Sequence, residues 1–123
     1  MKSNFKKLII DIKIHDLNRA VDFYKNVLGL GLIHKESEWA SFGAVGAEVH
    51  LYMHGGAECG LEFRVVNINK EVQILKNKGV KFFIEQDRPD FIGIVSDEVM
   101  ECSWGKMSLF RDSEGNQLAL IEE

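Results

Sequence analysis

Glutamate, histidine and tyrosine alternate with apolar residues in one short segment of the chain. Glu48, His50 and Tyr52 occupy every second position, and Val49 and Leu51 fill the positions between them. Alternate side chains of a β-strand lie on the same face, so the three polar groups are predicted to share one face of a strand. A carboxylate, an imidazole and a phenol placed together can hydrogen-bond a polar ligand, coordinate a metal ion or transfer a proton near neutral pH.

Other segments of the chain alternate in the same way. Their faces opposite the regular apolar positions carry Ile9, Asp11 and Lys13, then Gly60, Glu62 and Arg64, then Gln117, Ala119 and Ile121. Two interpretations of these faces are open. They form either a solvated outer surface, which is usual for an antiparallel or mixed sheet, or the lining of a cavity. Gly60 and Ala119 favour a cavity because their small side chains leave room for a ligand.

These segments belong to an internal repeat. Residues 10–19 match residues 61–70 in side-chain class, so that Asp11 corresponds to Glu62, and the match continues to Gly29 and Gly79 with one deletion. A match of this length indicates two copies of one structural unit. We therefore expect the two copies to share a fold.

A helix is predicted after the first strand of each copy, because each copy shows an N-cap side chain, an apolar stripe and a terminating glycine. In the first copy these are Asp16 or Asn18, then Leu17, Val21, Tyr24 and Leu28, then Gly29. In the second copy they are Asn67 or Asn69, then Ile68, Val72 and Leu75, then Gly79. The helices are expected to cover the regular apolar faces of the strands: Leu8, Ile10, Ile12 and Ile14; Val49, Leu51 and Met53; Leu61, Phe63 and Val65; Leu118 and Leu120.

Three short strands are predicted after each helix, which gives a β-α-β-β-β order in both copies. The expected ranges are 31–36, 38–42 and 47–53 in the first copy, and 81–86, 106–111 and 117–122 in the second. Residues 87–105 form a long connection that is predicted to be a lid or binding loop, or to contain a further strand at 92–95.

Composition excludes several classes of function. The chain has 123 residues and a net charge of -4 without a basic stripe, so neither nucleic acid nor an anionic membrane is an expected partner. No apolar stretch approaches the roughly 20 residues of a membrane span. Cys59 and Cys102 form neither a disulfide framework nor a Cys-x-x-Cys metal pair, which favours the reducing cytoplasm. Nucleotide-binding and serine-hydrolase motifs are missing from the sequence.

Two segments resemble the glyoxalase/bleomycin resistance protein/dioxygenase (vicinal oxygen chelate) superfamily. Residues 16–30, with their Asp-Leu opening, Phe-Tyr pair and Leu-Gly ending, resemble the family's first helix. Residues 104–116 resemble its closing hairpin, although Ser113 replaces the proline of the usual Asp-Pro-Asp-Gly-Asn turn. The resemblance covers essentially the whole chain. It implies a single α+β domain over residues 1–123, in which two tandem βαβββ modules, about 5–54 and about 59–123, form curved mixed sheets around a cleft with the helices on the outer face.

The resemblance also implies four positions at which many family members hold a divalent metal. In this sequence those positions fall on Ile9, His50, Gly60 and Ala119, and only His50 can coordinate an ion. Metal-dependent glyoxalase or dioxygenase activity is therefore doubtful, and the expected cofactor is none. The alternative is a displaced site for Mn, Fe or Zn made by His50, Glu62 and Asp11, which would give a lyase or dioxygenase. A metal-free enzyme with His50 as a general base near Glu62 is a further alternative.

A metal-free member resembles the drug-sequestering proteins of the family, so we expect small-molecule binding, with an antibiotic or a metabolite as the ligand. The expected ligand-binding residues are His50, Glu62, Asp11, Arg64, Tyr52, Trp104, Glu48 and Gln117; catalytic residues are not assigned. Trp39 either stacks on the ligand or packs in the core or a dimer interface. The resemblance further implies a homodimer.

Overall fold

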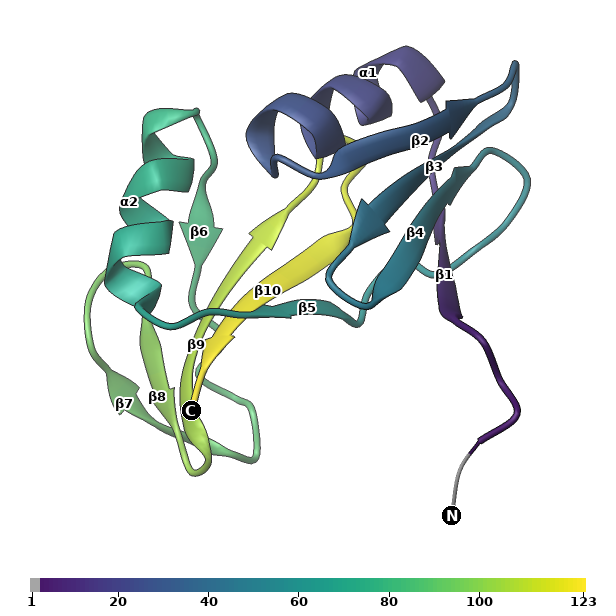
Figure 1. Cartoon of the computed structure of the whole chain (residues 1–123). Helices are drawn as coiled ribbons and strands as arrows, with labels where there is room; N and C mark the ends of the chain where they lie inside the picture. The colour runs from purple at the N-terminus through teal and green to yellow at the C-terminus, as the bar shows by residue number, and fades with distance from the viewer. Residues whose placement is uncertain (1–2) are drawn as a thin grey trace. The chain divides into compact units, whose positions relative to one another are not determined.

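The structure is a computed structural model that describes residues 3–123 (Figure 1). It divides into two compact units. The first, called unit 1 below, contains residues 1–58 together with 112–116, and the second, unit 2, contains residues 59–111 and 117–123. No helix within the described range has the length and apolar character that crossing a membrane requires.

Unit 1 is a four-stranded sheet with one helical segment packed against it. Its elements are β1 (Leu8–Lys13), α1 (Leu17–Asp22), the π-helical turn η1 (Phe23–Val27), β2 (Gly31–Lys35), β3 (Trp39–Ala44) and β4 (Ala47–Tyr52). The strand order is β1-β4-β3-β2, with β1 parallel to β4 and the other pairs antiparallel. The predicted β-α-β-β-β order is therefore present in the first copy.

The helix of unit 1 begins where the sequence predicts but buries a different face. The side chain of Asp16 accepts a hydrogen bond from the backbone N–H of Arg19, so Asp16 is the N-cap. Leu17 and Tyr24 are buried as expected, but the third buried residue is Ala20, whereas Val21 and Leu28 are only half-buried. Val21 is in α1, where Ala20 takes the buried position three residues after Leu17. Leu28 follows η1, whose wider π-helical turn changes the angular spacing of the side chains.

The apolar face of the unit 1 sheet is buried where the helix covers it. Ile12, Ile14, Val49 and Leu51 are each at most 1% exposed. Leu8, which the alternation also predicts to be covered, is 63% exposed. The difference follows from position along the strand. Leu8 is the first residue of β1, and the buried residue of this strand, Ile12, comes near its other end.

Unit 2 repeats this plan with a larger sheet. Its elements are β5 (Leu61–Arg64), α2 (Ile68–Asn77), β6 (Phe82–Phe83), β7 (Phe91–Ile94), β8 (Met100–Cys102), β9 (Gly105–Arg111) and β10 (Gln117–Glu122). The strand order is β5-β10-β9-β8-β7, and β6 pairs with β9. The first and last strands are parallel, as in unit 1. Asn67 caps α2 by accepting from the N–H of Lys70, which matches the role of Asp16 in the first copy.

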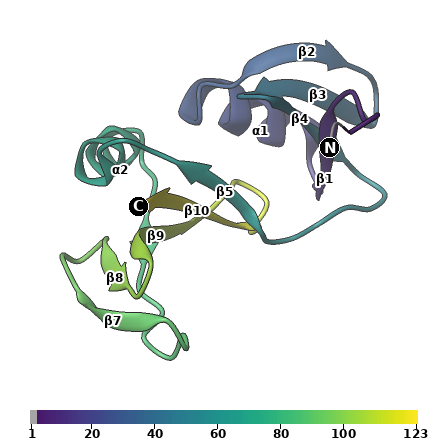
Figure 2. The same ribbon diagram turned by 60° about the horizontal axis from the view of Figure 1, so that its bottom comes forward.

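The long connection in unit 2 is a β-hairpin. β7 and β8 pair antiparallel and extend the sheet on the side of β9 away from β5 (Figure 2). The alternative prediction of a strand at 92–95 comes close to β7, but β8 was not predicted, and the strand expected at 81–86 is reduced to the two residues of β6. The connection is therefore largely part of the sheet rather than a free lid.

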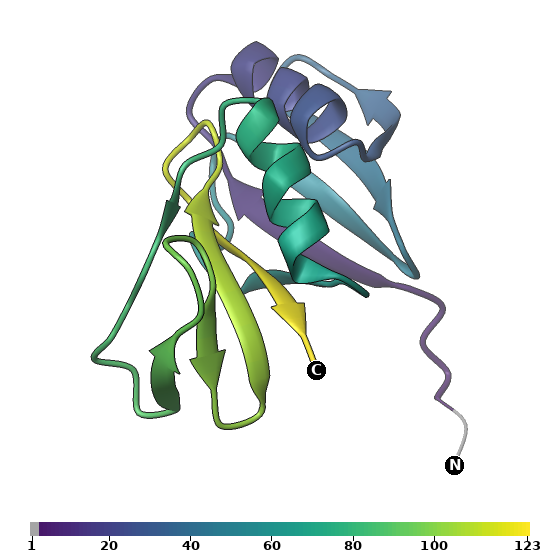
Figure 3. The same ribbon diagram turned by 90° about the vertical axis from the view of Figure 1, so that its left-hand side faces the viewer.

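Both faces of the unit 2 sheet carry buried apolar side chains. The buried residues of α2 are Ile68, Val72 and Leu75, and the helix lies across the sheet (Figure 3). A separate buried cluster contains Met100, Cys102, Met107, Leu109 and Ala119, with Phe83, Ile84, Phe91 and Ile121 packed against it. Ala119, 3% exposed, thus lies in a packed core. The prediction that Ala119 leaves room for a ligand was wrong, because the β7–β8 hairpin supplies apolar side chains to this face.

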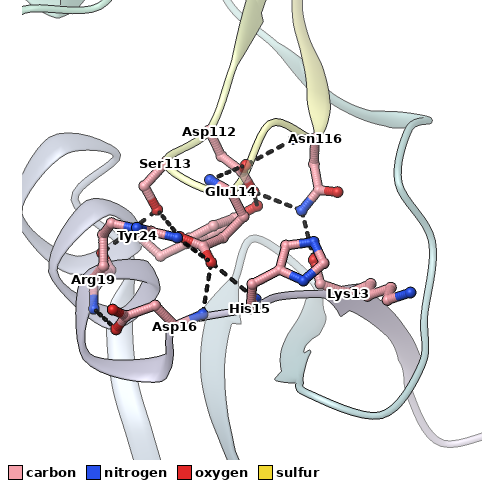
Figure 4. A network of polar contacts seen from close by, with 9 residues as sticks. All are labelled: Lys13, His15, Asp16, Arg19, Tyr24, Asp112, Ser113, Glu114 and Asn116. Carbon is pink, nitrogen blue, oxygen red and sulfur yellow. Dashed lines mark hydrogen bonds and ion pairs between the residues drawn. The ribbon is translucent and has the colours of Figure 1, made fainter.

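The turn at residues 112–116 joins β9 to β10 but packs within unit 1 (Figure 4). The carboxylate of Asp112 accepts from the hydroxyl of Tyr24 at 2.7 Å and from the N–H and side-chain amide of Asn116 at 2.9 Å. The same amide of Asn116 donates to the carbonyl oxygen of Lys13 at 2.7 Å. Burial, and after it the negative charge of Asp112, raises the pKa of Tyr24 far above its ordinary value of 10, so the phenol is the permanent donor of this bond.

Glu114 in the same turn also binds residues of unit 1. Its side chain is 0% exposed and forms an ion pair with Arg19 at 2.8 Å. It also accepts from the backbone N–H groups of His15 and Asp16, at 2.9 and 2.8 Å, directly before α1. Burial alone would raise the pKa of Glu114, but hydrogen bonds from Arg19, from these two N–H groups and from Ser113 outweigh burial and lower it to about 2. Glu114 is therefore ionised wherever the protein is folded near neutral pH.

Candidate functional site

The candidate site lies on the open face of the unit 1 sheet, where strand register aligns the predicted residues. Asp11 of β1 is directly opposite His50 of β4, and Trp39 of β3 is directly opposite Tyr52. Ser41 of β3 completes the row on the other side of His50. The residues that the sequence predicts to share a face therefore do so, from three neighbouring strands.

Backbone contacts hold Asp11 in place from both sides of β1. One side pairs with β4, and on the other side Ala57 donates to the carbonyl of Asp11 at 2.8 Å and accepts from the N–H of Lys13 at 3.0 Å. Gly56 permits this contact, since its φ is +123° and a Cβ there would lie 2.8 Å from the N of Lys13. The carboxylate of Asp11 consequently projects from a strand that is paired along both edges at this point.

A hollow of about 370 Å³ opens on this face and is lined by Asp11, Trp39, His50 and Tyr52. The volume falls within the roughly 300–1,000 Å³ that is usual for small-molecule sites. The indole of Trp39 lies 5.6 Å from the imidazole of His50 between ring centroids, with the planes tilted by 30°. Tyr52 is 40% exposed, so part of its ring is available to a ligand. The hollow combines aromatic walls with one carboxylate and one imidazole.

His50 is held by carboxylates on two strands. Its Nε2 lies 3.1 Å from Glu48 Oε1, and its Nδ1 lies 3.8 Å from Asp11 Oδ1. Glu48 also forms an ion pair with Lys7 at 2.8 Å. Two hydrogen bonds lower the pKa of Glu48: the one from Lys7 has the larger effect, and the one from His50 has the next largest. Glu48 therefore acts as a charged support that orients the imidazole, while the other ring nitrogen faces Asp11. A pairing of His50 with Glu62, which belongs to unit 2, stays a prediction.

Trp39 is the site residue that sequence reasoning left undecided. Its indole lies between the imidazoles of His34, at 5.3 Å, and His50. The signal that could have placed it is the tight turn at residues 43–46, since counting back from the pair Ala44 and Ala47 puts Trp39 opposite Tyr52. Hairpin register is set by the turn, so this pairing could be read from sequence.

His34 and His54 are exposed, and their rings lie beside Trp39 and Tyr52, respectively. Each is paired with a carboxylate of its own, His34 with Glu36 and His54 with Glu38 at 2.8 Å. These pairs are more than half exposed and salt-screened, so they contribute little to stability. Each of these two carboxylates therefore has its own partner outside the hollow.

The other predicted site residues belong to unit 2. Arg64 forms an exposed ion pair with Glu123 at 2.7 Å. The indole N–H of Trp104 donates to Asp90 Oδ2 at 2.7 Å, and the guanidinium of Arg88 binds the same carboxylate. The hydrogen bond from Arg88, followed by that from Trp104, lowers the pKa of Asp90. Glu62 is exposed and Gln117 is half-buried. Ligand contacts by these four residues, Glu62, Arg64, Trp104 and Gln117, stay a prediction.

The residues present do not fit the divalent metal that the fold implies. Ile9, Gly60 and Ala119 carry no donor atom, and Ala119 is packed in the apolar cluster of unit 2. No group of three or more His, Cys, Asp or Glu side chains able to hold an ion occurs among residues 3–123. On the open face of unit 1, Glu48 is already paired with Lys7 and His50, which leaves Asp11 and His50 as two donors, whereas a catalytic zinc site usually has three protein ligands. We therefore derive no step through a metal.

No protein-family model matches the sequence, and no curated protein matches it. Solved structures do match the fold. A lactoylglutathione lyase from Agrobacterium tumefaciens has a TM-score of 0.73 at 14% identity, and the match covers 98% of this chain and 96% of that chain. An antibiotic binding protein from Streptomyces sp. CB03234 has a TM-score of 0.69 at 19% identity, with 99% and 98% covered.

A third match is a member of the glyoxalase/bleomycin resistance protein/dioxygenase superfamily from Sphaerobacter thermophilus. It has a TM-score of 0.71 at 21% identity, and the match covers 97% of this chain and 98% of that chain. An enzyme and a binding protein thus share this architecture, so the fold by itself does not select between them. Together with the paired units and the two helices, these matches establish that the chain has the fold of the glyoxalase/bleomycin resistance protein/dioxygenase superfamily.

Proposed function

We propose that this protein binds a small aromatic molecule, such as an antibiotic or an aromatic metabolite, in the unit 1 hollow and that binding needs no metal. The observation that carries the proposal is the hollow itself, in which Trp39 and Tyr52 form walls around Asp11 and His50. Flat aromatic rings with a few fixed polar groups favour a ligand that stacks and forms one or two hydrogen bonds. The antibiotic binding protein from Streptomyces supports the proposal as an example of binding on the same fold.

The donor set of the site supports metal independence. His50 already has Glu48 on Nε2 and Asp11 facing Nδ1, so both ring nitrogens are directed at carboxylates of unit 1. An imidazole between carboxylates can donate a hydrogen bond to a ligand in place of Asp11, which lies at the longer distance of 3.8 Å. His50 is thus positioned as a ligand contact supported by Glu48.

We also propose a cytoplasmic homodimer. Cys59 and Cys102 are both free thiols, one exposed and one buried, which suits a reducing compartment. Exposed apolar side chains on the edge strand β7, Ile92 at 61% and Ile94 at 55%, support a contact with a second copy. Sedimentation of the purified chain tests this, and a monomer at high concentration would remove the dimer from the proposal.

The binding proposal is tested on protein purified without a His-tag, in EDTA, against a panel of aromatic antibiotics and metabolites. A ligand that binds the folded state raises the melting temperature. We expect at least one such ligand, with a Kd weakened about tenfold or more by Trp39→Ala, because stacking on an aromatic side chain contributes about 1 kcal/mol or more. Trp104→Ala measures the contact predicted for the other tryptophan, and a Kd unchanged in this variant would assign the stacking to Trp39 alone.

Two results would contradict the proposal. The first is a stoichiometric divalent ion in the purified protein together with loss of every thermal shift in EDTA, which would favour the alternative metalloenzyme. The second is a ligand whose affinity is unchanged in both Trp39→Ala and His50→Ala, which would place binding elsewhere.

A further inference from the structure

Asp11 differs from the other carboxylates around the unit 1 hollow. Its side chain is 60% exposed, and its ion-pair contact with His50 Nδ1 is 3.8 Å long, beyond hydrogen-bonding distance. Each carboxylate oxygen can accept two hydrogen bonds. The Asp11 carboxylate therefore enters the hollow with most of its acceptor capacity unused.

The neighbouring carboxylates are each closer to a basic partner. Glu48 binds Lys7 at 2.8 Å and His50 at 3.1 Å. Glu36 pairs with His34, and Glu38 pairs with His54 at 2.8 Å. The nearest lysine along β1, Lys13, shares the face of Asp11 and is in register with Tyr52, but it is not among the lining residues of the hollow. Among the residues that line the hollow, Asp11 thus contributes the fixed charge, and it is negative.

The aromatic rings of the hollow attract a cation, as the Asp11 carboxylate does. Trp39 and Tyr52 are opposite each other in the β3–β4 register, and both line the hollow with Asp11. The face of an aromatic ring carries negative potential and attracts a cation, most strongly for tryptophan. A positively charged group placed at Asp11 would also lie beside these rings, whereas an anion would meet unfavourable potential from both sources.

We infer that the ligand class is a flat aromatic molecule that carries a positive charge, with the cationic group at Asp11 and the ring system stacked on Trp39. The inference rests on the proposed function and narrows its ligand. Asp11 is the specificity-determining residue in this arrangement, since the aromatic walls alone would accept neutral rings of the same size.

The experiment uses three two-ring probes of one shape and different charge: naphthylmethylamine (cationic), naphthylmethanol (neutral) and naphthylacetate (anionic). Dissociation constants are measured by NMR titration of the full chain in low salt with EDTA, with the amide shifts of Asp11, Trp39 and His50 reporting the location. We expect the amine to bind about tenfold more tightly than the alcohol, from one partly exposed ion pair and one cation–π contact, and the acetate most weakly.

Two variants assign the preference to one carboxylate. Asp11→Asn keeps the shape of the side chain and should make the amine and the alcohol bind equally. Glu101→Gln removes the same charge from an exposed residue of β8 that is not among the expected ligand-binding residues, and it should retain the preference of the parent. Raising the salt concentration should shrink the preference in the parent without any substitution, because the ion pair is partly exposed.

The outcomes separate this inference from the proposed function. If all three probes bind the hollow with similar affinity and Trp39→Ala weakens all three, the charge preference is wrong but aromatic binding stands. If Asp11→Asn retains the preference or Glu101→Gln removes it, Asp11 is not its source. If no probe shifts the amides of the hollow up to its solubility limit, the inference is overturned together with the aromatic hollow as a binding site.

Discussion

The two units correspond to the two copies of the repeat, yet their sheets differ on the face away from the helix. In both units the first strand is parallel to the last, and the helix is capped at the same repeat position, by Asp16 or Asn67. On the face away from the helix, however, unit 1 presents Trp39 and His50, and unit 2 buries a cluster around Ala119. A shared backbone plan therefore permits one copy to be a binding surface and the other a packed layer.

The insertion in unit 2 explains this difference. In unit 1, β2 and β3 are separated by three residues, 36–38, and nothing in that short connection extends over the open face. In unit 2 the corresponding connection contains the β7–β8 hairpin, which contributes Met100 and Cys102 to the buried cluster and brings Phe91 against it. The long connection thus fills the second face with apolar side chains, which unit 1 leaves accessible.

The turn between β9 and β10 is a further difference between the units, because it packs within unit 1. The turn 112–116 lies between two strands of unit 2 but is counted, by its contacts, within unit 1. Its polar groups anchor the segment that leads from β1 into α1. We therefore expect substitutions in this turn to affect unit 1 more than the unit that supplies the flanking strands.

Asp112→Ala gives the largest expected effect. The carboxylate accepts from Tyr24, from two backbone N–H groups and from the amide of Asn116, so its removal leaves buried donors without a partner. We expect a loss of about 4 kcal/mol in the free energy of unfolding, measured by denaturant titration. Tyr24→Phe removes one of these bonds and should cost about 1 kcal/mol.

Amide exchange of the Asp112→Ala variant sharpens the comparison between the units. Exchange should accelerate more at Ile12 and Leu51, in the core of unit 1, than at Met107 and Leu109 in unit 2. Equal acceleration in both units would show that they open together, and the asymmetry argued from the turn would then be wrong.

This asymmetry marks a limit of what the sequence could predict. The repeat, the strand alternation and the caps are local patterns, and they correctly placed Asp11, His50 and Tyr52 on one face. The turn 112–116 was recognisable as a hairpin turn, but its partner Tyr24 is 88 positions away in the sequence. Pairings at that separation depend on how the units fold, which single-sequence patterns do not encode.

The packed face of unit 2 shows the same limit. Alternation correctly put Ala119 on the face away from the helix, and a small residue there favoured a cavity. What fills the space is Met100 and Cys102 of β8, a strand of three residues that was too short to be predicted. Periodicity identifies faces, whereas the side chains that cover a face come from elsewhere in the chain.

The ion pair of Glu114 gives the second-largest expected effect and depends on pH. Its pKa is lowered from 4.5 to about 2 in the folded protein, so its contribution is complete above its ordinary pKa and is lost as the pH falls toward 2. We expect Glu114→Gln to lower the free energy of unfolding by about 2 kcal/mol at neutral pH, with the difference from the parent shrinking below about pH 4.

The control for Glu114 is an ion pair of unit 2. Glu123→Gln breaks the pair with Arg64, whose two side chains are 53% and 67% exposed, and should change stability little at any pH. Denaturant titrations of the three proteins from pH 7 to pH 2 provide the measurement. A constant difference between parent and Glu114→Gln across this range would show that Glu114 acts through shape rather than charge.

The smallest expected effect compares two serines, one in each unit. Ser108 of β9 is 0% exposed, and its Oγ is a buried side-chain atom without a hydrogen-bond partner in the described part of the chain. Ser113 in the turn donates to Glu114 at 2.9 Å. A buried hydroxyl without a partner costs about 1 kcal/mol or more, so Ser108→Ala should raise the melting temperature, while Ser113→Ala should lower it. Both substitutions remove a hydroxyl oxygen. Opposite changes in melting temperature would therefore show that the effect depends on whether the hydroxyl has a hydrogen-bond partner. If Ser108→Ala also lowers the melting temperature, the Ser108 hydroxyl has a hydrogen-bond partner in solution. Water would then reach the packed residues of unit 2 under α2.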